Sequence, residues 1–172
     1  MTQPVLGITG WKNSGKTTMT ERLVSELTRR GLRVSTIKHA HHAFDIDKEG
    51  TDSYRHRQAG ASEVAIVSGN RWALMHELRG EDEPDLDDIL RRIAPCDLVV
   101  IEGYKRESHP KIEVRRLDAA DRTPLTGGKA NIIAVAADYP VSAESVPVFD
   151  LDDISGIADF VMARLKPRNC PA

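Results

Sequence analysis

The sequence has little cysteine, no long apolar run and no excess of one charge sign. Its two cysteines, Cys96 and Cys170, have no CxxC spacing, which argues against a disulfide scaffold or a zinc knuckle and favours a reduced cytoplasm. No apolar run approaches the ~20 residues that span a bilayer, and the first residues lack the pattern of a secretory signal. The 24 Lys and Arg against 26 Asp and Glu argue against nucleic-acid or membrane binding.

The chain does contain enough apolar sequence for one folded domain over residues 1–172. It is 40% hydrophobic and 29% charged, which is typical of a globular protein. Apolar runs predict strands at residues 5–9, 33–38, 63–68, 71–77, 97–101, 112–114, 132–137 and 146–149, and apolar periodicity predicts helices at 16–30, 53–60, 85–93 and 153–165. This alternation indicates an α/β fold with a mostly parallel sheet and helices on both faces. A hairpin signal at residues 68–70 predicts some antiparallel pairing, which would make the sheet mixed.

The most specific motif is GWKNSGKT at residues 10–17, which matches the phosphate-binding pattern GxxxxGK[ST]. It follows a predicted strand and begins a predicted helix, as the pattern requires, so the fold is expected to be P-loop NTPase-like. In this interpretation the backbone N–H groups of the loop converge on a phosphate. Lys16 supplies a charge to the β and γ phosphates, and the Thr17 hydroxyl binds Mg²⁺. The motif therefore predicts a nucleoside triphosphate site.

A second acidic ligand is expected at the carboxyl end of a neighbouring strand. Asp97 and Glu102 flank the apolar run at residues 97–101 and lie about 17 Å apart along it. Ligands of open α/β sheets bind beyond the carboxyl ends of the strands. We therefore assign Glu102 to Mg²⁺ binding or water positioning and interpret Asp97 as structural.

The same rule draws attention to the segment KHAHHAFDID at residues 38–47. Its three imidazoles and two carboxylates allow a transition-metal site, a loop that senses the triphosphate or contacts substrate, or a solvated loop. Asp45 and Asp47 could reach Mg²⁺ through water. Asp138 ends another strand at the same edge, where it could meet the base or a partner. The base-reading motif NKxD is absent, so nothing in the motifs separates GTP from ATP.

Four segments together carry a family resemblance: GWKNSGKTT, TIKHAHHAFDID, DSYRHRQAGA and LVVIEGYK. In this order they closely resemble the molybdopterin-guanine dinucleotide biosynthesis protein B family. The resemblance implies a homodimeric P-loop protein that binds GTP with Mg²⁺ and hydrolyses it slowly. It also implies an adapter role beside the molybdopterin guanylyltransferase, a MobA-like protein that joins GMP to molybdopterin.

The resemblance also assigns residues. The phosphate-binding set would be Gly10, Lys12, Asn13, Ser14, Gly15, Lys16, Thr17 and Thr18. Glu102 and Lys105 match the EGxK segment of the family and would complete the site. From the motif and the strand-end rule, Lys16 and Glu102 are the candidate catalytic residues. His39, Asp45 and Asp47 lie in the histidine-aspartate loop of the family.

Three functions stay open on the residues alone. The leading one is a GTP-binding adapter with weak GTPase activity in molybdenum cofactor maturation. Cations beyond the phosphate loop (Lys38, Lys105, Arg106 and Lys111) fit a second phosphorylated ligand such as molybdopterin. The alternatives are a small-molecule kinase and a metal-delivery GTPase that uses the histidine segment. Arg106 is the candidate for a cationic group that would accelerate hydrolysis.

Overall fold

The computed structural model describes residues 3–40, 44–128, 130–142 and 144–167. The chain divides into two compact units, of which unit 1 comprises Met1–His39 and Ile93–Ala172 and unit 2 comprises Ala40–Arg92. Unit 2 is thus an insertion between two strands of unit 1. The expectation of one nucleotide-binding domain over residues 1–172 stays a prediction.

Unit 1 is built on a parallel sheet with the strand order β2-β5-β1-β6-β7-β8. Its strands are β1 (Val5–Thr9), β2 (Val34–Lys38), β5 (Leu98–Glu102), β6 (Lys111–Arg115), β7 (Ile132–Ala137) and β8 (Val148–Asp150). All neighbouring pairs in this sheet are parallel. Their carboxyl ends therefore lie at one edge, where Lys38 and Glu102 are register partners. The predicted α/β class with a mostly parallel sheet is confirmed.

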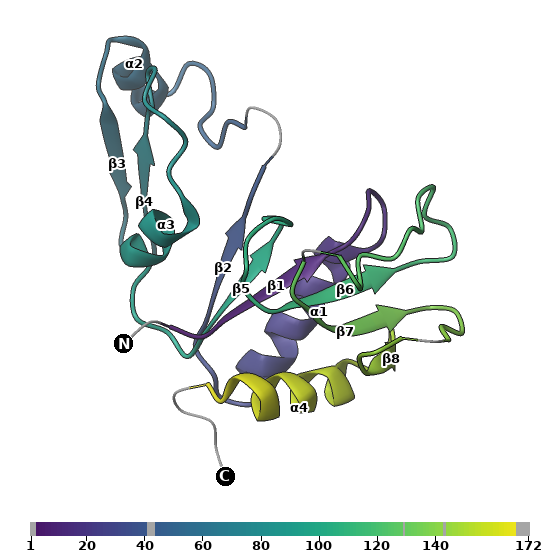
Figure 1. The fold of residues 1–172 in the computed structure, drawn as a ribbon. Helices are drawn as coiled ribbons and strands as arrows, with labels where there is room; N and C mark the ends of the chain where they lie inside the picture. The colour runs from purple at the N-terminus through teal and green to yellow at the C-terminus, as the bar shows by residue number, and fades with distance from the viewer. Residues whose placement is uncertain (1–2, 41–43, 129, 143, 168–172) are drawn as a thin grey trace. The chain divides into compact units, whose positions relative to one another are not determined.

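Two helices of unit 1, α1 (Lys16–Arg29) and α4 (Ile154–Leu165), pack against each other and cover the same face of the sheet (Figure 1). Met19, Leu23 and Leu27 of α1 are buried because a four-residue spacing puts them on one side of the helix. They join Leu6, Ile8, Leu98, Val100, Ile112 and Val114 of the strands in the main core, together with Ile157, Ala158 and Val161 of α4. Both described helices of unit 1 therefore lie on one face of its sheet.

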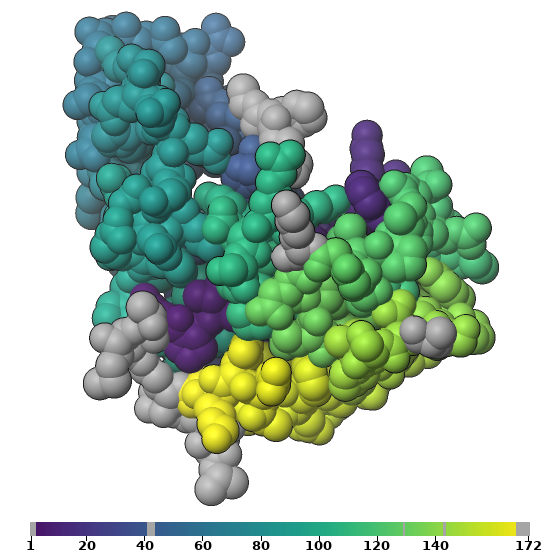
Figure 2. Space-filling model, viewed as in Figure 1, coloured from purple at the N-terminus to yellow at the C-terminus, as the bar shows by residue number. Residues whose placement is uncertain are grey.

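On the opposite face of this sheet, loops contact strand β6. Because side chains alternate along a strand, Lys111, Glu113 and Arg115 of β6 point away from the helices, and all three are buried. Their partners lie in the loops that precede and follow β6, as described below. Figure 2 shows the green segments after β5, which include these loops, as a continuous part of the molecular surface.

Unit 2 contains helix α2 (Asp52–Gln58), the strands β3 (Glu63–Val67) and β4 (Trp72–His76), and helix α3 (Leu86–Arg92). The predicted hairpin forms, with Val67 opposite Trp72 and Glu63 opposite His76. It is a separate two-stranded antiparallel sheet, so it does not make the main sheet mixed as expected. Across the described ranges, no helix is long and apolar enough to cross a membrane.

Candidate functional site

The loop between β1 and α1 has the backbone shape that a phosphate-binding loop requires. Positive φ angles occur at Gly10 (148°), Asn13 (63°) and Gly15 (87°), a conformation that glycine adopts without strain. A Cβ on Gly10 would lie 2.5 Å from both Ser14 Oγ and the carbonyl oxygen of Val114. Glycine is therefore required here, as the motif predicts. Ser14 is buried, whereas Lys12 and Asn13 of the loop and Thr17 and Thr18 at the start of α1 are exposed.

Lys16 lies folded over this loop. Its Nζ donates a hydrogen bond to the carbonyl oxygen of Trp11 at 2.6 Å. Burial lowers the pKa of Lys16, and the ammonium of Lys105 lowers it further. Lys105 Nζ lies 4.1 Å from the centre of the Trp11 ring, so Trp11 contacts both cations. The two ammonium groups repel each other without an intervening anion, which favours the binding of an anion between them.

Glu102 reaches the same edge of the sheet from the end of β5. Its Oε1 accepts a hydrogen bond from Thr17 Oγ1 at 3.0 Å and lies 3.6 Å from Lys38 Nζ. A hydroxyl and a carboxylate are oxygen ligands of the kind that Mg²⁺ prefers. These two residues could therefore hold a magnesium ion, although the ion would have to replace the hydrogen bond between them.

His39 lies next to Glu102, as the sequence predicts. Its backbone N–H donates to the carbonyl oxygen of Glu102 at 2.9 Å, and its ring centre lies 4.4 Å from that of Tyr104. A Cβ on Gly103 would come within 2.9 Å of His39 Cβ, so Gly103 allows the two strand ends to approach. His41 and His42 of the same segment lie outside the described residues. Asp97, at the other end of β5, accepts a hydrogen bond from the Arg33 N–H at 2.7 Å, consistent with its structural interpretation.

Asp45 and Asp47 belong to unit 2, where both bind Arg57. Asp47 Oδ2 accepts a hydrogen bond from Arg57 Nε at 3.2 Å, and Asp45 accepts two from Arg57 Nη2 at 3.1 Å. Burial would raise the pKa of Asp47, but hydrogen bonds from Ser53, Thr51 and Arg57 leave it below its usual value. The two aspartates therefore organise the start of α2. Their predicted contact with Mg²⁺ stays a prediction.

Lys111 does not serve as a surface phosphate ligand, contrary to the sequence interpretation. It is fully buried, and its Nζ donates to the carbonyl oxygens of Glu107 and His109. The ammonium thus ties down the loop between β5 and β6, which carries Lys105. This correction removes Lys111 from the cations that could bind a second phosphorylated ligand.

Two residues near the phosphate loop have no counterpart in the sequence motifs. Trp11 occupies a variable position of the pattern, and its Nε1 donates to the carbonyl oxygen of Thr123 at 2.7 Å. Arg116 follows β6 directly and packs against Gly15. Its place at the carboxyl end of a strand next to β1 is a signal that could have found it.

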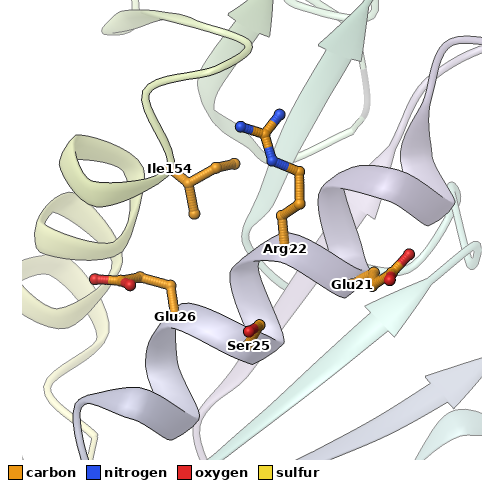
Figure 3. A pocket seen from close by; sticks show the side chains of 5 residues that line it. All are labelled: Glu21, Arg22, Ser25, Glu26 and Ile154. Atoms are coloured by element: carbon orange, nitrogen blue, oxygen red, sulfur yellow. The ribbon is translucent and has the colours of Figure 1, made fainter.

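A separate cavity of about 330 Å³ lies between α1 and the start of α4 (Figure 3). Its lining consists of Glu21, Arg22, Ser25, Glu26 and Ile154. Arg22 pairs with Asp152 at 2.6 Å, and Glu26 pairs with Arg29 and Arg30. The cavity is open and lacks a glycine-rich loop, so the carboxyl edge of the sheet is the better candidate site. Within the described residues, no cluster of three or more His, Cys, Asp or Glu side chains could hold a metal ion.

A parallel sheet with a glycine-rich loop between β1 and α1, Lys16 above it and Glu102 beside Thr17 defines a P-loop NTPase-like nucleotide-binding protein. The sequence model described as "Molybdopterin guanine dinucleotide synthesis protein B" matches residues 5–138. The chain belongs to this family.

Curated relatives and solved structures agree with this assignment. The chain is 39% identical to the molybdopterin-guanine dinucleotide biosynthesis adapter protein of Escherichia coli, over 96% of this chain and 95% of the relative. It is 41% identical to that of Haemophilus influenzae, over 92% and 87%. The solved structure of the MobB homolog from Bacillus stearothermophilus superposes with a TM-score of 0.71 at 32% identity, over 94% of this chain and 97% of the other.

Proposed function

We propose that this protein binds GTP with Mg²⁺ at the edge formed by residues 10–18 and Glu102, and hydrolyses the nucleotide slowly. The observation that carries the proposal is the meeting of Thr17 and Glu102, 85 residues apart, at 3.0 Å beside Lys16. A triphosphate would lie against the loop N–H groups and Lys16, and Thr17 and Glu102 would hold Mg²⁺. His39 and Lys105 would form the walls of this site.

The bound nucleotide would serve an adapter role in molybdenum cofactor maturation. The named relatives are adapter proteins of molybdopterin-guanine dinucleotide biosynthesis. We propose that this chain assists a molybdopterin guanylyltransferase of the MobA-like kind in the cytoplasm. Lys38 and Lys105 at the strand edge would be available to the phosphate of molybdopterin.

The proposal includes a homodimer, and the hairpin of unit 2 supplies a suitable apolar surface. Val67, Trp72 and Leu74 lie on one face of the β3–β4 sheet because cross-strand partners point to the same side. Their exposed fractions are 74%, 71% and 48%. Such a patch is typical of a protein–protein contact. Trp72→Glu should therefore shift the mass measured by light scattering from dimer to monomer.

Calorimetric titration with GTP and with ATP, both with Mg²⁺, tests the nucleotide assignment. Lys16→Ala should abolish GTP binding while the circular dichroism of the protein is unchanged. Lys48→Ala, which removes an exposed lysine of unit 2, is the matched control and should bind GTP like the wild type. Wild-type affinity in folded Lys16→Ala would contradict the proposal. Equal or tighter ATP binding would favour the kinase alternative over the adapter.

The role of Glu102 has its own test. Glu102→Gln keeps the shape of the side chain but removes its charge, so it should reduce the hydrolysis rate more than the affinity for GTP. Single-turnover hydrolysis and calorimetry on the same preparation measure the two effects. Equal losses in both would show that Glu102 only helps to bind the nucleotide.

A further inference from the structure

Arg116 is the first residue after β6, and it lies directly against the phosphate loop. A Cβ built on Gly15 would lie 3.1 Å from Arg116 Nε and 3.5 Å from its Cζ. The absence of a side chain at position 15 therefore makes room for this guanidinium. β6 is the neighbour of β1 on the side opposite β5, so Arg116 and Glu102 approach the loop from two sides.

The guanidinium of Arg116 contains one buried donor that lacks an acceptor in the described ranges of the chain. Nε is buried, and it has no hydrogen-bond partner among the described residues. A buried N–H without an acceptor costs free energy, and native proteins rarely keep one without a reason. Arg115, the preceding residue, also has a buried Nε without a partner among the residues that the structure describes, but its Nη groups bind the carboxylates of Glu113 at 2.8 Å and Glu144 at 2.5 Å.

The backbone around Arg116 is fixed by hydrogen bonds. The N–H of Leu117 donates to Asp138 Oδ1 at 2.8 Å, and the N–H of Ala119 donates to the carbonyl oxygen of Arg116 at 3.1 Å. Asp138 directly follows β7, so the turn after β6 is attached to the next strand of the sheet. Arg116 therefore lies in a turn that is hydrogen-bonded to the residue after β7.

We infer that Arg116 is a phosphate-binding residue of the nucleotide site, a cation supplied by the chain itself. This inference rests on the proposed nucleotide binding and adds a residue to it. Arginine presents a planar fork of N–H donors that matches phosphate oxygens, and such charge-assisted bonds are the strong ones. A phosphate in the loop would give Arg116 Nε the acceptor that the described residues do not provide.

The position of Arg116 beside Gly15 also indicates which part of the nucleotide it would contact, namely the phosphates. Gly15 precedes Lys16 within the loop, and the N–H groups at the start of α1 face the phosphates in this interpretation. Arg116 brings a further positive charge to a loop edge where Lys16 and Lys105 already repel each other. These cations together favour a multiply charged anion over a neutral base or ribose.

The test compares Arg116→Ala with Arg164→Ala, which removes an exposed arginine from the last turn of α4. Calorimetry measures binding of Mg²⁺–GTP, and competition with Mg²⁺–GTP measures binding of inorganic triphosphate and of guanosine. Loss of a charge-assisted contact should weaken GTP binding by about 10- to 100-fold. The affinity of Arg116→Ala for inorganic triphosphate should fall by a similar factor, whereas its affinity for guanosine should equal that of the wild type. The Arg164→Ala variant should bind all three ligands like the wild type.

Further measurements separate binding from a structural role. Because Arg116 Nε has no hydrogen-bond partner in the part of the chain that the structure describes, Arg116→Ala should unfold at the wild-type temperature without nucleotide but gain less stability from added GTP. Guanidinium chloride at low millimolar concentration should restore part of the GTP affinity of Arg116→Ala. Arg116→Lys, which keeps the charge but not the fork, should lie between the wild type and Arg116→Ala, and it serves as the test if Arg116→Ala does not fold.

The outcomes distinguish the role of Arg116 from the proposed binding of GTP on which it rests. Wild-type GTP affinity in folded Arg116→Ala, together with lost binding in Lys16→Ala, would overturn the role of Arg116 alone. An equal loss of guanosine and GTP affinity would also overturn it, because the residue would then act through the loop structure or the base. No GTP binding by the wild-type protein would overturn both.

Discussion

His109 makes the stability of unit 1 depend on pH in a predictable direction. Burial lowers the pKa of its imidazole to about 4, and the ammonium of Lys111 contributes to this shift. Both ring nitrogens are buried, and neither has a hydrogen-bond partner within the described residues. Protonation would therefore create a buried cation whose two N–H groups lack acceptors, next to another cation.

The sign of the effect follows from the two pKa values. The imidazole of His109 has a pKa near 6.5 in the unfolded chain and about 4 in the folded protein. Between these two pH values the unfolded chain therefore binds a proton that the folded protein does not bind. The stability contribution is present above pH 6.5 and is lost as the pH falls towards 4. Between pH 7 and pH 5 this amounts to about 1–2 kcal/mol of unfolding free energy, allowing for partial access of solvent.

Urea denaturation of the wild type and His109→Gln at pH 7 and pH 5 measures this contribution. Glutamine stays neutral in both states, so the variant should lose about 1–2 kcal/mol less than the wild type over this range. His76 is present in both proteins, so its contribution to the pH dependence cancels in the comparison. That contribution has the opposite sign, because hydrogen bonds to Glu63 and Glu81 raise the pKa of His76. Parallel losses of stability in the two proteins would refute the reasoning.

Three further substitutions test the buried charges. Arg115→Met leaves the buried Glu113 carboxylate without its cation, and we expect chemical denaturation to show about 3–5 kcal/mol less stability. Lys111→Met leaves two carbonyl oxygens without their donor; it should cost about 1–3 kcal/mol and raise the hydrogen-exchange rates of residues 104–110. Asp47→Ala removes an acceptor of Arg57 in unit 2, so hydrogen exchange should accelerate in α2, with residues of β1 as the unchanged reference.

The elements that the sequence predicts well are those whose signals are local. The four-residue spacing of Met19, Leu23 and Leu27 predicts α1 within one residue of its observed end, and the hairpin is predicted from its turn. Whether the hairpin belongs to the main sheet is not determined by such a local signal. Antiparallel pairing between neighbours needs only the turn, whereas membership in the main sheet depends on contacts across the whole chain. The separation of the hairpin from the main sheet was therefore not predictable from the hairpin signal.

The site divides in the same way. Residues 10–17 are contiguous, so their loop is predictable from the motif, and Glu102 follows from the rule on carboxyl ends. The same rule should have singled out Arg116, but the adjacent Arg115 has the same residue type and a different role. Their difference lies in long-range partners: Arg115 pairs with Glu144, 29 residues away, whereas Arg116 packs on Gly15. Sequence spacing does not contain this information.

Strand β6 shows why the burial of a sheet face is hard to predict from the sequence. Its alternation of Lys111, Glu113 and Arg115 with apolar residues is typical of a strand with one side in water, yet all three charges are buried. Each of them binds a loop or strand connection: Lys111 the segment that carries Lys105, Glu113 the backbone of Leu125, and Arg115 the side chain of Glu144.

These buried charges connect the sheet to the groups around the phosphate loop. Apolar residues at the same positions would often give equal or greater stability, because burying ions costs desolvation energy. They would not hold the loop of Lys105 or the segment whose Thr123 carbonyl accepts the Trp11 N–H. A variant with three apolar residues in β6 should therefore keep the sheet and lose the order of the site. The charges of β6 are better understood as positioning the nucleotide-binding edge than as stabilising the fold.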